Sequence, residues 1–184
     1  MTSPHVMVDL ETAGKDPNAL ILSIGAAKFD PMADSIIDSF HIAVDLRQMP
    51  MNAHGFTVDP GTVAWWLAPE RAEARVALDS VPKVDLASAL DGFALWLGDP
   101  RNFAGVWGNG ATFDNVILLN AFDKLNMERP WTYRQDRCFR TFNNLAKSVP
   151  FADFGVAHSA LDDAISQALH MQKIVKHLGL TEVL

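Results

Sequence analysis

The sequence contains a single cysteine, Cys138, which excludes a disulfide within the chain and a zinc site built from several cysteines. No apolar run reaches the roughly 20 residues that a membrane-spanning helix requires. The first residues also lack the basic and then apolar segments of a secretory signal. We therefore expect a cytoplasmic protein that does not associate with membranes.

Positive charge is scarce as well. The chain has 15 Lys and Arg residues and 22 Asp and Glu residues, which gives a net charge of −7. This balance argues against a protein that coats nucleic acid through Lys and Arg contacts to phosphates. It leaves open an enzyme that meets phosphates through bound metal ions. Hydrophobic residues make up 49% of the chain, which excludes a disordered protein. A length of 184 residues favours one domain spanning 1–184.

The hydropathy pattern changes along the chain from strand-like to helix-like. Strands are predicted at 6–10, 20–29, 35–44 and 103–107, and the short Asp30-Pro31 turn makes the second and third antiparallel. Helices are predicted at 60–78, 85–98, 113–125, 139–147 and 160–178, with a break at Pro69. A strand meander followed by strand–helix alternation predicts an α/β domain with a mixed sheet covered by helices.

Acidic residues stand at the ends of the predicted elements. Asp9 and Glu11 close the first strand, two positions apart, and therefore share one face of it. Asp114 follows the buried 103–107 strand and opens a helix, where the helix dipole favours an acid. Each feature has a structural explanation when taken alone, since acids at strand and helix ends are usually solvated.

The start of the last helix adds two more polar groups. Asp163 lies close to the apolar stripe of this helix, where an acid is costly unless it is paired or binds a metal. His158 precedes the helix in a loop that contains Gly155, a position more often occupied by an exposed polar residue than by a catalyst. Ser159 and Asp162 have the spacing of an N-cap and an aspartate version of the capping box.

The combination of four acids and one histidine is more informative than any single residue. Open α/β sheets gather the carboxyl ends of their strands at one edge, so these side chains can meet there. A cluster of carboxylates without cysteine selects hard cations such as Mg²⁺ or Mn²⁺.

Three segments carry this pattern in order: Val8–Thr12, Asn109–Asp114 and His158–Ala164. They resemble the three exonuclease motifs of the DEDDh family, which includes proofreading exonucleases, oligoribonuclease and RNase T. Further segments resemble its small stand-alone exoribonuclease-like branch of phages and bacteria, namely Thr62–Trp66, Trp107–Gly110 and Asp136-Arg137. The resemblance covers residues 8–164 and implies an RNase H-like fold, a five-stranded mixed sheet between helices.

The resemblance also implies an activity and its catalytic residues. Asp9, Glu11, Asp114 and Asp163 would hold two divalent cations, and His158 would act as general base toward a water molecule. Two metal ions about 3.5–4 Å apart would activate that water and stabilise the leaving 3′-oxygen. The implied reaction is 3′–5′ removal of nucleoside 5′-monophosphates from single-stranded nucleic acid, with RNA favoured and DNA possible.

Substrate contacts are expected next to these residues. Leu10, Glu11 and Thr12 would meet the terminal nucleotide, and the other candidates are Trp65, Trp66, Asn109, Phe113 and Arg137. Aromatic side chains bind single strands by stacking. Adjacent residues of a helix face different ways, so at least one tryptophan of the pair is expected in the core. Arg137 suits a phosphate contact or a surface salt bridge.

Two other functions fit the same residues. A catalytically silent module on this fold would bind nucleic acid or protein through its acidic, Met- and Trp-containing surface. A metal-dependent phosphatase or nucleotidase would share the site chemistry and act on small substrates. A homodimer is compatible with a self-association surface on the last helix and the Trp pair.

Overall fold

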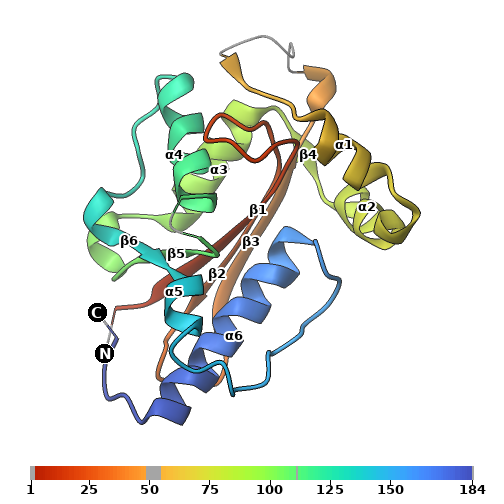
Figure 1. Cartoon of the computed structure of the whole chain (residues 1–184). Helices are drawn as coiled ribbons and strands as arrows, with labels where there is room; N and C mark the ends of the chain where they lie inside the picture. The colour runs from red at the N-terminus through yellow and green to blue at the C-terminus, as the bar shows by residue number, and fades with distance from the viewer. Residues whose placement is uncertain (1–2, 49–54, 111, 184) are drawn as a thin grey trace.

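The computed structural model of the chain describes residues 3–48, 55–110 and 112–183. A mixed sheet of six strands, in the order β4-β3-β2-β1-β5-β6, runs through the molecule with helices on both faces (Figure 1). The strands are β1 (His5–Thr12), β2 (Ile21–Phe29), β3 (Ile36–Val44), β4 (Lys83–Val84), β5 (Val106–Gly108) and β6 (Asp136–Cys138). The helices are α1 (Pro60–Leu67), α2 (Ala72–Ser80), α3 (Leu86–Leu97), α4 (Asp114–Lys124), α5 (Phe139–Asn143) and α6 (Ala160–Leu178).

The α/β class and the mixed sheet predicted from the sequence are confirmed. Strands β1, β2 and β3 form an antiparallel meander, and β5 pairs parallel with β1. The expected count of five strands is wrong. The short edge strands β4 and β6, of two and three residues, raise the count to six and are too short to show an alternating pattern.

The predicted break at Pro69 is confirmed, because α1 ends at Leu67 and a 3₁₀ turn over Pro69–Arg71 leads into α2. Asp59 caps α1 by accepting hydrogen bonds from the backbone N–H groups of Gly61 and Thr62. The described residues contain no helix that combines the length and the hydropathy needed to cross a bilayer.

Two apolar layers cover the sheet. Met7, Phe29 and Trp107 pack under α6 on one face, whereas Val6 and Val8 face the other core, under α3 and α4 (Figure 1). Alternate residues of a strand point to the same face, so Asp9 and Glu11 follow Met7 on the α6 side. The strand periodicity thus directs both carboxylates toward the start of α6.

The start of α6 lies in direct contact with the sheet at Gly25. This glycine pairs with Asp9 across β1 and β2. A Cβ atom at position 25 would lie 2.1 Å from the carbonyl carbon of Ala160 and 2.2 Å from the nitrogen of Leu161. No larger residue fits without moving one backbone away from the other. The absence of a side chain therefore sets the distance between α6 and the strand that carries Asp9.

We predict that Gly25→Ala destabilises the protein by at least about 2 kcal/mol, the typical cost of overpacking. For a chain of this size the midpoint of thermal unfolding should fall by roughly 4–8 °C, measured by circular dichroism. Gly92→Ala in α3 is the matched control, because its Cβ would meet only the Phe40 ring, at 3.8 Å. The control should melt at or above the wild-type temperature. Equal melting of Gly25→Ala and wild type would contradict the steric argument.

Candidate active site

Strand β1 supplies two of the carboxylates. Glu11 is buried and Asp9 is partly buried. The Asp9 Oδ1 atom accepts a hydrogen bond of 2.9 Å from Nε2 of Gln167, which lies on α6. The sheet and α6 thus jointly fix the orientation of Asp9.

Asp114 joins this group from the first turn of α4. Its Oδ1 atom accepts the backbone N–H of Leu10 at 3.2 Å, and its Oδ2 atom accepts that of Asn109 at 2.9 Å. Leu10 stands between Asp9 and Glu11 in the sequence, so the bond ties α4 to the strand end that carries them. Gly108 permits this approach, because a Cβ there would lie 3.0 Å from the Asp114 Cβ.

The loop before α6 brings His158 to the same place. The backbone of His158 has a φ of +64°, which is uncommon for a residue other than glycine. Its N–H donates to Oδ2 of Asp163 at 3.0 Å. Asp163 therefore holds the loop that carries the histidine.

The predicted N-cap Ser159 is in place, but its side chain makes no capping hydrogen bond, so the capping-box prediction is wrong. Asp162 instead accepts the backbone N–H of Val156 at 2.9 Å. Gly155, with a φ of +63°, lies against the same carboxylate, since a Cβ there would be 2.3 Å from Asp162 Cγ. Both aspartates of the first turn thus bind loop amides rather than cap the helix through Ser159.

The side chains brought together in this way form one cluster. Glu11, His158 and Asp163 each offer a ligand atom, and these atoms lie within 4.8 Å of one another. Burial raises the pKa of Asp9 well above its usual value, and the charges of Asp114, Glu11 and Asp163 raise it further. The structure therefore gathers the four acids and the histidine singled out in the sequence.

The cluster concentrates negative charge away from water. Burial, together with the charges of Asp163 and Asp114, raises the pKa of Glu11 to about 9. Burial also raises the pKa of Asp114 to about 6, against the opposing effect of the N–H bonds from Leu10 and Asn109. Oxygen ligands crowded in this way fit a hard divalent cation, whose charge would favour their ionised forms.

A comparison with protein families gives this cluster a context. The model of the 3′-5′ exoribonuclease Rv2179c-like domain matches residues 4–175. The chain belongs to this family. The resemblance to a 3′–5′ exoribonuclease family drawn from the sequence motifs is thereby confirmed.

Solved structures share the fold of this Rv2179c-like chain. Exonuclease I of E. coli in complex with a dA16 oligonucleotide is 16% identical, with a TM-score of 0.63 over 96% of this chain and 41% of that one. The zinc-bound form of E. coli exonuclease I with single-stranded DNA has 16% identity and a TM-score of 0.62, over 97% and 41%. Cell-death related nuclease 4 has 15% identity and a TM-score of 0.53, over 96% and 64%.

The Rv2179c-like chain spans about two fifths of the length of the exonuclease I chains. At this level of identity the likeness shows the RNase H-like fold. No curated protein sequence matches the chain.

The expected substrate contacts separate into buried and accessible side chains. Leu10, Thr12 and Trp66 are buried, the last with 7% of its surface exposed. Trp66 Nε1 donates to the backbone oxygen of Thr12 at 3.0 Å, a structural bond. Asn109 and Phe113 are partly exposed next to Asp114. Trp65, with 37% of its surface exposed, is the tryptophan whose ring contacts His158.

The structure brings a different arginine to the cluster from the expected one. Arg137 donates to the carbonyls of Arg134 and Asp136, beside Gly105 at the opposite end of β5 from Asp114. Arg140 of α5 donates to the backbone oxygen of Asn109 at 2.7 Å, and its charge lowers the pKa of Asp114. The sequence signal for Arg140 was its place just after β6, a strand the hydropathy pattern does not reveal.

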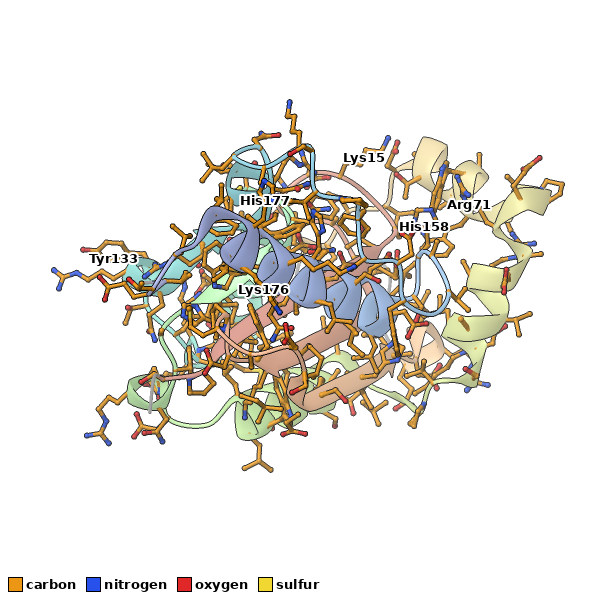
Figure 2. All side chains as sticks on the ribbon, turned by 90° about the horizontal axis from the view of Figure 1, so that it is seen from below. Lys15, Arg71, Tyr133, His158, Lys176 and His177 are labelled. Atoms are coloured by element: carbon orange, nitrogen blue, oxygen red, sulfur yellow. The ribbon has the colours of Figure 1, made fainter. Side chains whose placement is uncertain are left out.

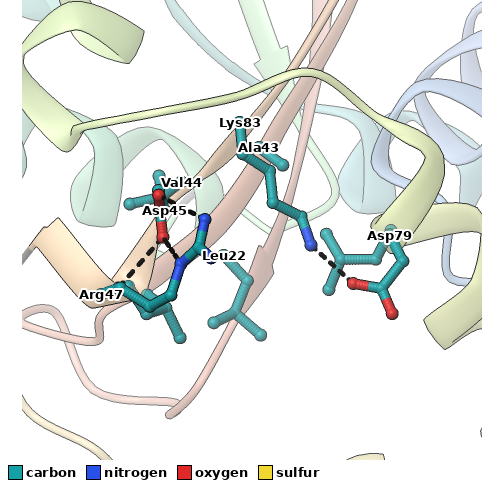
Figure 3. Close-up of a pocket in the computed structure, with 9 residues that line it drawn as sticks. Leu22, Ala43, Val44, Asp45, Arg47, Asp79 and Lys83 are labelled. Atoms are coloured by element: carbon teal, nitrogen blue, oxygen red, sulfur yellow. Dashed lines mark hydrogen bonds and ion pairs between the residues drawn. The ribbon is translucent and has the colours of Figure 1, made fainter.

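A separate cavity of about 410 Å³ lies between the end of β3, β4 and α2 (Figure 3). Its charged residues are paired with one another, Arg47 with Asp45 and Lys83 with Asp79. None of the four clustered acids or His158 lines it. This cavity is therefore unrelated to the acidic cluster.

We predict that Glu11→Gln stabilises the metal-free protein increasingly as the pH rises. Glu11 keeps its proton to about pH 9 in the folded state, whereas the unfolded chain releases it near the model value of 4.5. The folded wild type therefore holds more protons than the unfolded chain within this window, so its stability falls as the pH rises. The gain of the variant should grow by at most about 1.4 kcal/mol, or roughly 3–6 °C, for each pH unit within this window.

Melting temperatures at pH 5, 7 and 8.5 in the presence of a chelator, three values that sample this window, measure the effect. The exposed Glu73 of α2 provides the control variant Glu73→Gln, which should follow the wild-type curve. If the melting temperatures of Glu11→Gln and wild type changed in parallel with pH, Glu11 would not retain its proton in the folded protein.

Proposed function

We propose that this protein is a metal-dependent 3′–5′ exonuclease that removes nucleoside 5′-monophosphates from single-stranded nucleic acid, with RNA favoured. The observation that carries the proposal is the convergence of Glu11, His158 and Asp163 within 4.8 Å, beside Asp9 and Asp114. Membership of a family described as 3′-5′ exoribonuclease supports both the polarity and the preference for RNA. The oligonucleotide complex of exonuclease I, on the same fold, supports a single-stranded substrate.

The four carboxylates would hold two divalent cations, Mg²⁺ or Mn²⁺, which supply activation of water and stabilisation of the leaving oxygen. In the proposed reaction the water oxygen bonds to phosphorus, and the bond from phosphorus to the 3′-oxygen of the preceding nucleotide breaks. His158 accepts the proton of the water through a ring nitrogen. The hydrogen bond from the backbone N–H of His158 to Asp163 keeps the loop that carries the histidine next to the acids.

The terminal nucleotide would lie along the end of β1. Because Leu10 and Thr12 are buried, their contribution would come from the backbone, while Phe113 and Asn109 would offer accessible side chains. Arg140 supplies the positive charge nearest to Asp114 in the contacts described above and would bind a backbone phosphate.

The direct test is a degradation assay on matched RNA, single-stranded DNA and duplex DNA carrying a 5′ label. With Mg²⁺ or Mn²⁺ we expect stepwise shortening from the 3′ end, fastest on RNA, with nucleoside 5′-monophosphates as products. A chelator and Asp114→Asn should each abolish it, the substitution by at least about 10³-fold.

Other outcomes would point elsewhere. Shortening that survives both the chelator and Asp114→Asn would defeat the proposal. Release of inorganic phosphate would identify a phosphatase, and binding without turnover that persists in Asp163→Ala would identify a silent binding module.

We predict that Arg140→Ala raises the KM for a short oligonucleotide by roughly 10- to 100-fold at low salt, with a much smaller change in kcat. A charged hydrogen bond to phosphate is worth about 1.5–3 kcal/mol, and its loss should also flatten the dependence of KM on salt. Arg137→Ala is the matched control, since this arginine binds backbone carbonyls away from the acids. An equal effect of the two variants would remove Arg140 from the substrate path.

A further inference from the structure

Helix α1 is fastened to the strand that carries Glu11. Trp66 Nε1 donates to the backbone oxygen of Thr12, the residue after Glu11, at 3.0 Å. Arg75 of α2 donates to the carbonyl oxygens of Trp66 and Ala68, the second at 2.8 Å. These bonds satisfy backbone carbonyl groups at the C-terminal end of α1. The position of α1 is therefore set relative to the acidic cluster, although α1 contributes no carboxylate to it.

The neighbouring Trp65 faces His158. Their ring centroids are 4.8 Å apart with the planes at 88°, an edge-on aromatic contact. The Arg71 guanidinium carbon lies 4.3 Å from the centroid of the Trp65 ring. Figure 2 shows Arg71 and His158 beside each other at one end of the molecule. The His158 ring thus lies close both to Trp65 and to the carboxylates of Glu11 and Asp163.

We infer that Trp65 is a positioning residue that holds the His158 ring against Glu11 and Asp163. The backbone of His158 is held by its hydrogen bond to Asp163, but that bond leaves both side-chain torsions free. An aromatic pair contact changes a rotamer population by roughly 2- to 10-fold. Trp65 therefore increases the fraction of molecules in which the histidine faces the acids. This inference rests on the proposed function, in which His158 receives a proton.

Nucleobase stacking is the competing role for Trp65, because an exposed aromatic ring beside an arginine suits a single-stranded ligand. The contacts favour positioning. The Trp65 ring already touches His158, Arg71 and Trp66, the last with centroids 5.2 Å apart. In the structure 37% of the Trp65 surface is exposed.

A double-mutant cycle separates the two roles. Kinetics are measured for wild type, Trp65→Ala, His158→Ala and the double variant on a short oligonucleotide at saturating metal. We expect Trp65→Ala to lower kcat by roughly 2- to 10-fold with little change in KM, and to have no further effect once His158 is absent. Trp65→Phe should retain most of the activity. A raised KM, or the same loss in the His158→Ala background, would overturn positioning in favour of stacking.

Nuclear magnetic resonance of the metal-free protein tests the contact without any assay of activity. The imidazole signal that is lost in His158→Ala belongs to His158. In wild type the Trp65 ring current displaces this signal from that of an exposed histidine, and in Trp65→Ala it should return toward that value. An unchanged signal would overturn the inference, even if the protein degrades RNA. A displaced signal in a protein without nuclease activity would defeat the proposed function alone.

Val76→Ala is the matched control for both experiments, because Val76 is an exposed residue of α2. It should change neither the kinetics nor the His158 signal. Melting curves of all variants establish that each one is folded under the conditions of measurement.

Discussion

The mutual repulsion of four carboxylates in a largely buried cluster is the constraint on which the rest of this structure depends. Burial and like charge both raise the pKa values of Asp9 and Glu11. Asp9, Asp114 and Asp163 each accept a hydrogen bond from outside the acidic set, from Gln167, from two backbone amides and from His158. These bonds orient the carboxylates without neutralising them, and the remaining charge is what a cation would balance.

Such a cluster also requires that backbones approach more closely than side chains allow. Gly25 lets the start of α6 touch β2 opposite Asp9, and Gly108 lets α4 begin against β5. In both places the missing side chain sets the distance between an acid and its neighbours. The rigid part of the site is therefore built by the sheet and two helix starts, in which small displacements are resisted by direct steric contact.

Much of this could be predicted from the sequence because the informative segments are long or strongly patterned. Strands β1 to β3 and helix α6 carry clear periodicity, and the order of the acids restricts them to one edge of a sheet. Strands β4 and β6 are too short to show a hydropathy pattern. The number of strands and the position of Arg140 could therefore not be predicted from the sequence.

Other features depend on tertiary contacts that no local pattern encodes. The role of Gly25 follows from the pairing register of β1 with β2 and from the position of α6 on the sheet. Trp65 and Trp66 are adjacent in the sequence, and it is Trp66 that is buried, with its ring N–H bonded to Thr12. Ser159 has the sequence of an N-cap residue, but Asp162 and Asp163 bind the loop amides instead.

The acids and the histidine are held in physically different ways, and this difference has consequences for the reaction proposed for the chain. The carboxylates stand on regular elements whose positions are fixed by backbone contact. His158 stands on a loop at a φ of +64°, with one backbone bond to Asp163 and one aromatic neighbour on α1. The orientation of its ring therefore depends on a contact outside the sheet. Changes in the sheet should alter whether cations bind, whereas changes on α1 should alter how often the bound state is competent for proton transfer.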